Sequence, residues 1–327
     1  MLGSAAKVNW SQEKIVLLIA IVLFCLFSIF LNGFLSSGNL IALLRSVSAL
    51  GILGIGMAIV VIGAGIDLAI VAIYCMSAAW TFHLAGAGVA LPAAMLLGLL
   101  FAVAAGAISG ALIAYVEIPP MFATLGMASL VFGFARYKLV PLWMAYMPAS
   151  ASPIAWIGGG FVFGVPTPIL FFALVAGLAW LFLRRTKPGR FVYAIGDNPR
   201  AARITGAPVR GIIVLQYVLA ASIAYLAGMI TATAVASMNT EVANSSMIYD
   251  VILVVVLGGV GLSGGQGGIR NVIVGTLLIG ILLNGMTIMN IEYTLQNVIR
   301  SLILLAAIVL DSVVNPRDEQ TSQQGDM

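Results

Sequence analysis

Apolar residues run in long stretches along almost the whole chain, and the charged residues are confined to the gaps between them. A helix needs about 20 apolar residues to cross the roughly 30 Å hydrocarbon layer of a bilayer. Ten stretches predict membrane helices, the eighth being short for a full crossing. They are residues 15–32, 40–62, 68–85, 89–115, 120–137, 166–183, 212–235, 247–261, 270–289 and 295–313. The pattern predicts an all-α polytopic membrane protein with about ten transmembrane helices, some of them short or broken.

The second and third stretches are separated only by residues 63–67, which is too short a gap to leave the membrane. We therefore expect a break in the helix there, with protein or water covering the freed backbone groups. Asp67 lies in this break, and an intramembrane acid is a functional candidate. The alternative is that Asp67 caps the N-terminus of the third helix, and the two roles are compatible.

Composition supports the membrane assignment and excludes several other classes. The chain is 62% hydrophobic and 8% charged, whereas a soluble domain carries roughly 25% charged residues. The net charge of +4 does not form a basic face interleaved with aromatic residues, so we expect no nucleic-acid partner. The single histidine and the two isolated cysteines form no ligand set, so we expect no metal and no cofactor.

Basic residues are concentrated in one loop, residues 184–211, which carries seven of the fifteen arginines and lysines and one acid, Asp197. The positive-inside rule places this loop in the cytoplasm. Six stretches precede the loop and four follow it, so both termini are expected in the cytoplasm. The chain then divides into a cytoplasmic tail at 1–14, a transmembrane domain at 15–314 and a disordered cytoplasmic tail at 315–327.

A short helix is predicted inside the basic loop. Asn198 suits the N-cap, Pro199 suits the first helical position, and Gly206 suits the left-handed residue after the end. Such a helix has about two turns and is too short to be stable alone, so it must rest on something. Ala201 and Ala202 would give it a small, flat surface for a cytoplasmic partner. The alternative is a basic loop that only sets the topology.

Four segments resemble motifs of one family. Residues Gly189–Gly206 resemble the coupling segment of permeases in ribose-type monosaccharide ABC importers. Gly65–Leu68, Pro119–Gly126 and Leu257–Gly268 resemble three further motifs of the same permeases, in the same order. The resemblance runs from about residue 40 to 311. One departure is the run Ala69-Ile-Val71, where the family usually has Ser-Val-Gly.

The resemblance implies a permease subunit of an ABC importer in the bacterial inner membrane. Two permease subunits, identical or different, would form a pathway for a small polar solute such as a sugar or polyol. A periplasmic binding protein would deliver the solute, and separate cytoplasmic ATPases would hydrolyse ATP, so the chain itself would be no enzyme. The coupling residues implied are Gly189, Asn198, Pro199, Ala201, Ala202 and Gly206, and the structural turn comprises Gly261, Gly264, Gly265 and Gly268.

A sugar pathway needs hydrogen-bonding and aromatic side chains with little charge. Candidates of that type are Phe122, Thr124, Asn244 and Asn284, together with Asp67. Each of the first four is more typical of a contact between helices than of a solute ligand. Leu262–Gln266 spells the signature of ABC ATPases, but the chain has no Gly-Lys dipeptide and hence no phosphate-binding loop.

Three other functions compete with this one. A branched-chain amino-acid ABC permease belongs to the same superfamily. An ion-coupled secondary transporter usually needs several buried ionisable groups, and Asp67 is nearly the only candidate. An intramembrane enzyme would need a catalytic motif such as H-E-x-x-H or G-x-S-x-G, and neither occurs.

Overall fold

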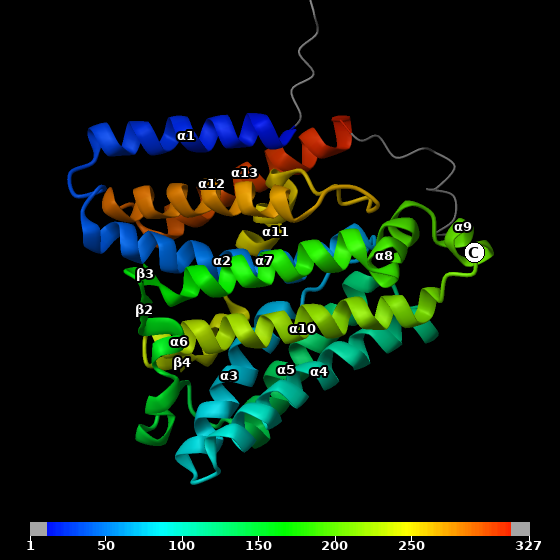
Figure 1. Cartoon of the computed structure of the whole chain (residues 1–327), viewed down its shortest axis with the longest axis horizontal. Helices are drawn as coiled ribbons and strands as arrows, with labels where there is room; N and C mark the ends of the chain where they lie inside the picture. The colour runs from blue at the N-terminus through cyan, green and yellow to red at the C-terminus, as the bar shows by residue number, and fades with distance from the viewer. Residues whose placement is uncertain (1–11, 315–327) are drawn as a thin grey trace, which may run out of the picture.

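The computed structural model describes residues 12–314, which form a bundle of long helices (Figure 1). The long helices are α1 (Gln12–Phe30), α2 (Ser37–Ile62), α3 (Ile70–Gly86), α4 (Leu91–Tyr115), α5 (Pro120–Phe134), α7 (Thr167–Arg185), α10 (Val209–Ala234), α11 (Met247–Gly258), α12 (Ile269–Ile288) and α13 (Tyr293–Val314). They match the ten predicted stretches to within three residues at every end. Within the described residues, six helices are long and apolar enough to cross a membrane by length and composition. The all-α polytopic fold is confirmed.

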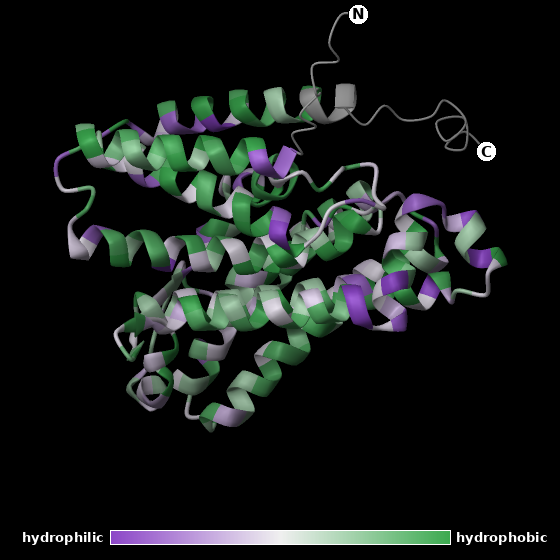
Figure 2. Ribbon diagram, turned by 45° about the horizontal axis from the view of Figure 1, so that its top comes forward, coloured by the Kyte–Doolittle hydropathy of each residue, from purple (hydrophilic) through white to green (hydrophobic). Residues whose placement is uncertain are grey.

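Two helices that join α7 to α10 mark one end of the bundle, which we call the arginine-rich end. They are α8 (Lys187–Asp197) and α9 (Pro199–Ile204), and they lie on the right in Figure 1. Figure 2 shows polar residues gathered there, whereas the long helices are mostly apolar. The predicted tails at 1–14 and 315–327 lie almost wholly outside the described residues.

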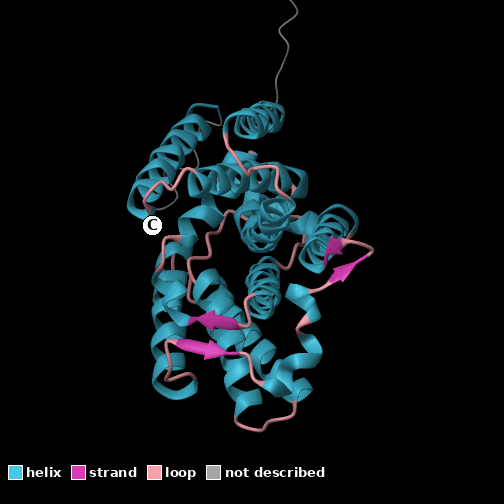
Figure 3. Ribbon diagram, turned by 90° about the vertical axis from the view of Figure 1, so that its left-hand side faces the viewer, coloured by secondary structure: helices cyan, strands magenta, loops and turns pink. Residues whose placement is uncertain are grey.

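Short elements gather at the opposite end, which we call the far end (Figure 3). Strand β1 (Met144–Tyr146) pairs antiparallel with β4 (Ser237–Asn239), and β2 (Phe161–Val162) pairs with β3 (Val165–Pro166). The remaining pieces are a π-helical turn at Ala135–Leu139, 3-10 turns at Ala149–Ile154 and Thr240–Asn244, and α6 (Trp156–Gly159). The sequence pattern predicts none of these strands, because two or three residues are too few for an alternating signal.

The core of the bundle lies around α2, α3 and α10. Burial distinguishes the inner helices from the outer ones. In the most apolar 18-residue segment of α2, 83% of the residues are buried, whereas in that of α1 only 11% are buried. Small residues allow close packing of α4 on α10: a Cβ on Gly106 would lie 2.5 Å from the Tyr217 carbonyl oxygen. Such small-residue contacts are typical of helix packing in membranes. The central helices are therefore covered by protein, whereas the outer ones leave large apolar side chains exposed.

The break predicted between the second and third helices is present at residues 63–69. Helix α3 has 17 residues, which span only about 25 Å at 1.5 Å per residue. Thr124 of α5 covers part of the break, because its Oγ1 donates a hydrogen bond of 3.2 Å to the Ile66 carbonyl.

Candidate functional site

Helices α8 and α9 form a hairpin that is fixed by its caps. Thr186 ends α7 and caps α8, with its Oγ1 accepting from the Gly189 N–H at 3.1 Å. Asn198 caps α9, and its Oδ1 accepts from the N–H groups of Arg200 and Ala201, both at 3.0 Å. Gly206 follows with a φ of +82°. The predicted capped helix is therefore present, whereas α8 was not predicted as a separate helix.

The exposed surface of α9 differs from the predicted one. Ala201 is exposed, but Ala202 is only 3% exposed and packs into the core. The expectation that both alanines face a partner is wrong for Ala202, because a helix turns neighbouring residues onto different faces. Ile204 is instead 87% exposed, between the exposed Arg203 and Thr205. An isoleucine among arginines in a polar loop was the available signal for this position.

At one point the hairpin meets α2 and the glycine-rich loop backbone to backbone. The Gly265 N–H donates a 2.8 Å hydrogen bond to the carbonyl of Ile62, the last residue of α2. Gly196 of α8 fits against both groups, since a Cβ there would overlap the Ile62 oxygen and lie 2.5 Å from the Gly265 nitrogen. We call the contact of Ile62, Gly196 and Gly265 the backbone junction. It lies next to the break at residues 63–69.

The glycine-rich loop between α11 and α12 uses its glycines unequally. Gly264 and Gly265 have φ values of +85° and +71°, in the left-handed region that favours glycine. Gly268 is extended, with a φ of 176°, and the Gly261 carbonyl accepts from the Gly264 N–H at 3.1 Å. Gly267, with a φ of +95°, was not singled out from the sequence. Its carbonyl accepts a 2.9 Å hydrogen bond from the Tyr193 hydroxyl of α8.

Asp67 lies in the break and is 1% exposed. Its Oδ1 accepts from the Ala69 N–H at 3.0 Å, and Oδ2 has no partner among the described residues. The predicted role as the N-cap of α3 is wrong in detail, because the helix begins at Ile70 and Ala69 occupies the cap position. Asp67 instead stabilises the turn before the helix.

Two further buried polar side chains border the break. Gln216 and Tyr217 of α10 are 2% and 1% exposed, and the Gln216 Nε2 and the Tyr217 hydroxyl have no partner among residues 12–314. The Tyr217 hydroxyl lies so close to Gly65 that a Cβ there would be 2.6 Å away. Buried polar groups normally find partners. Three buried polar groups at the break, the Asp67 Oδ2, the Gln216 Nε2 and the Tyr217 hydroxyl, therefore have no hydrogen-bond partner among the described residues.

The other predicted pathway residues are not brought together. Thr124 is buried at the break, whereas Phe122 is 71% exposed on the outside of α5. Asn244 is exposed in the 3-10 turn at the far end. Asn284 forms a reciprocal amide pair with Asn39 of α2, with N–H···O distances of 2.8 and 3.0 Å. That pair gives Asn284 a structural contact between helices.

A buried ion pair joins α11 and α13. The Arg300 Nη1 donates to the Asp250 Oδ2 at 2.6 Å, and Nη2 donates to the Asn297 Oδ1 at 2.6 Å. Asp250 and Arg300 are each 7% exposed. The expectation that Asp67 is nearly the only buried ionisable group is therefore wrong. An acid and a base inside two apolar stretches were the signal for this pair.

Within residues 12–314, a bundle of ten long apolar helices with a covered polar break and an exposed basic hairpin defines the class, which is a multi-span membrane protein. Comparison with known proteins narrows that class. Residues 39–308 match the family described as branched-chain amino acid transport system / permease component. The chain therefore belongs to this family of permease components.

Three curated relatives show the level of similarity. The chain is 30% identical to the ribose import permease protein of Escherichia coli over 304 residues, which is 93% of this chain and 94% of the relative. It is 33% identical to the ribose import permease protein of Bacillus subtilis over 299 residues, 89% of each chain. It is 29% identical to the fructose import permease protein of Rhizobium meliloti over 311 residues, 92% of this chain and 85% of the relative. No solved structure matches the chain.

Permeases of this kind are multi-pass inner-membrane subunits of ABC importers. ATP hydrolysis resides in a separate subunit, and a solute-binding protein is a further partner.

Proposed function

We propose that this chain is the permease that carries a sugar across the bacterial inner membrane, and that the α8–α9 hairpin docks on the cytoplasmic ATPase. The observation that carries the docking assignment is Ile204, 87% exposed on a helix held in place by the buried Ala202. Arg200 and Arg203 flank it and are exposed as well. Arginine is enriched at protein interfaces, and a large exposed apolar side chain between arginines suits the buried centre of such a contact.

The backbone junction supports transmission from the hairpin to the break. Gly196 belongs to the hairpin and Ile62 directly precedes the break, and no side chain lies between their backbones. Close-packed contacts transmit displacement because they have little free volume in which to absorb it. Motion of the hairpin then reaches the segment that carries Asp67 and borders Gln216 and Tyr217.

Charge distribution supports an orientation with both termini in the cytoplasm. Seven arginines and lysines lie in residues 184–211 at the arginine-rich end, which the positive-inside rule places inside. The far end, with the exposed Glu241 and Asn244, then faces the periplasmic binding protein.

Phe122 and Leu125 are 71% and 55% exposed on α5, and they suit pairing with a second permease subunit, identical or different.

The printed names of the relatives support a sugar as the solute, since those permeases import ribose and fructose. The runner-up is a branched-chain amino acid, as in the description of the family. Uptake by vesicles that contain the importer with its binding protein distinguishes them. Labelled monosaccharides and polyols should be accumulated with ATP, and accumulation of leucine alone would overturn the sugar assignment.

Docking is tested by replacing Ile204. The Ile204→Asp variant should weaken retention of the ATPase roughly thirtyfold, because loss of a hot-spot side chain costs about 2 kcal/mol. Ile204→Leu keeps the apolar surface and should retain the ATPase. Co-purification and uptake are measured for both variants. Full retention by Ile204→Asp would refute the docking assignment.

Orientation is tested with an impermeant thiol reagent on intact cells after Cys25, an exposed cysteine, has been changed to serine. Arg200→Cys at the arginine-rich end should stay unlabelled, and Glu241→Cys at the far end should be labelled. Labelling of Arg200→Cys in intact cells would invert the proposed topology and remove the basis for an ATPase at the hairpin.

A further inference from the structure

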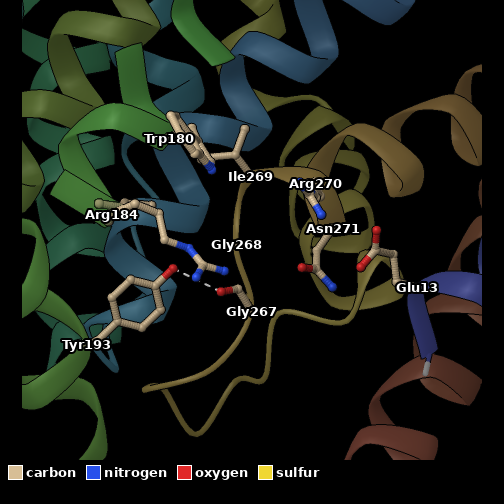
Figure 4. Close-up of a pocket in the computed structure, with 10 residues that line it drawn as sticks. Glu13, Trp180, Arg184, Tyr193, Gly267, Gly268, Ile269, Arg270 and Asn271 are labelled. Atoms are coloured by element: carbon tan, nitrogen blue, oxygen red, sulfur yellow. Dashed lines mark hydrogen bonds between the residues drawn. The ribbon is translucent and has the colours of Figure 1, made fainter. Parts of the chain in front are cut away.

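A cavity of about 320 Å³ opens at the arginine-rich end, between the first turn of α1, the end of α7, Tyr193 of α8 and the start of α12 with the two glycines before it. Figure 4 shows the Arg184 side chain extending toward Gly267 from one side of the glycine-rich loop, with Arg270 and Asn271 at the start of α12 on the other. Glu13 of α1 lies beside Arg270 and Asn271 on the other side. The cavity therefore brings together charged groups from segments far apart in the sequence.

The two arginines of the cavity have unused hydrogen-bonding capacity. Neither the Arg184 nor the Arg270 guanidinium forms a hydrogen bond or ion pair with another residue in the described part of the chain. Tyr193 lines the same cavity, and its hydroxyl is committed to the Gly267 carbonyl. Burial raises the pKa of the Tyr193 phenol above its ordinary value, so it remains a donor. Two guanidiniums and one carboxylate leave the cavity with one net positive charge.

An apolar stripe leads along α7 to this cavity. Leu174, Leu178 and Leu181 are 55%, 58% and 48% exposed, and their spacing of four and three residues puts them on one helix face. Arg184 follows three residues after Leu181, so it continues the same face at the arginine-rich end. Trp180, which lines the cavity, is 41% exposed, and tryptophan favours the membrane interface. The cavity therefore lies where a lipid headgroup would meet the bundle.

We infer that this cavity binds the phosphodiester headgroup of an anionic glycerophospholipid such as phosphatidylglycerol, with its acyl chains along the leucine stripe of α7. The Arg184 and Arg270 guanidiniums hold the phosphate oxygens, for which arginine has matching donor geometry. Glu13 accepts a hydrogen bond from a headgroup hydroxyl. One phosphate charge neutralises the net charge of the cavity, and basic pockets between membrane helices are known to take such headgroups.

A free phosphate has the same recognition chemistry but makes no use of the leucine stripe. Which leaflet supplies the lipid rests on the proposed topology, which makes the arginine-rich end cytoplasmic. Binding itself does not rest on the proposed function, because it is measured on the permease alone. Failure of the ATPase assignment and failure of the lipid site are therefore separate results.

The test is native mass spectrometry of the purified full-length chain titrated with phosphatidylglycerol, phosphatidylcholine or inorganic phosphate. Arg184→Gln and Arg270→Gln should each weaken phosphatidylglycerol binding about fivefold, and the double variant about 25-fold. Arg185→Gln and Arg200→Gln are matched controls, since both residues are exposed at the same end outside the cavity. Glu13→Gln removes the opposing charge but keeps an amide oxygen that can accept from the headgroup hydroxyl. It should therefore strengthen binding, a result that a misfolded variant would not give.

Wild-type affinity in the double variant would overturn the proposal. So would equal binding of phosphatidylcholine, because the headgroup charge would then play no part. Displacement of the lipid by millimolar inorganic phosphate would reassign the cavity to a soluble anion and would likewise overturn the lipid assignment.

Discussion

Replacing Gly196 with alanine tests whether the hairpin acts on the break through the main chain. The added Cβ would overlap the Ile62 carbonyl oxygen and would lie 2.5 Å from the Gly265 nitrogen. Both neighbours are backbone atoms, so no side-chain rotation can relieve the contact. The backbone junction must open, and the 2.8 Å hydrogen bond from Gly265 to Ile62 is lost with it.

The expected cost has two parts. Overpacking of a close contact costs about 1–3 kcal/mol, and loss of one hydrogen bond adds about 1 kcal/mol. The sum, about 2–4 kcal/mol, is comparable to the coupling free energy of about 1–3 kcal/mol typical between linked sites. Such a coupling corresponds to about 5–150-fold in the linked equilibrium. Because the substitution disrupts the coupling, the rate of solute-stimulated transport should decrease by a factor in that range.

The assay measures uptake and ATP hydrolysis together in proteoliposomes that contain the permease, its ATPase and its binding protein. Gly196→Ala should keep the ATPase bound, because Ile204 and the exposed face of α9 are unchanged, while fewer solutes are imported per ATP hydrolysed. Gly211→Ala is the matched control, since nothing lies within 4 Å of a Cβ at this glycine of α10. An unchanged ratio of uptake to hydrolysis in Gly196→Ala would refute transmission through the junction.

Substitutions at three other sites have expected outcomes that thermal unfolding in detergent and uptake assays can check. Arg300→Met should destabilise the protein by about 3–5 kcal/mol because the Asp250 charge is left buried and unpaired, and adding Asp250→Leu should restore most of that loss. Asn284→Ala should cost about 1 kcal/mol with uptake preserved, and abolished uptake at normal stability would instead place Asn284 on the solute pathway. Ala202→Asp should unfold the hairpin because the site is buried, whereas Ala201→Asp should leave stability unchanged and reduce ATPase binding.

The helices could be predicted because a bilayer sets both their length and their composition. Each of the ten long helices carries an apolar run in the sequence, so its position follows from hydropathy. The α9 helix could be predicted from Asn198, Pro199 and Gly206, since caps depend on a few neighbouring residues. Local rules therefore located both the bundle and the candidate docking helix.

Contacts between distant segments could not be predicted in this way. Asn39 and Asn284 are 245 residues apart, and Asp250 and Arg300 are 50 residues apart, so no local pattern pairs them. Which of Ala201 and Ala202 faces outward depends on how α9 is docked, and its own six residues do not determine that. The backbone junction has no side-chain signature at all.

The break between α2 and α3 has a consequence for biogenesis. Helix α3 reaches only about 25 Å, and the extended backbone before it cannot face acyl chains. Its cover includes Gln216 and Tyr217 of α10, which the ribosome makes about 150 residues later. The third span must therefore be sheltered by the insertion machinery until α10 arrives, so chains truncated before α10 should be recognised and degraded by membrane quality control.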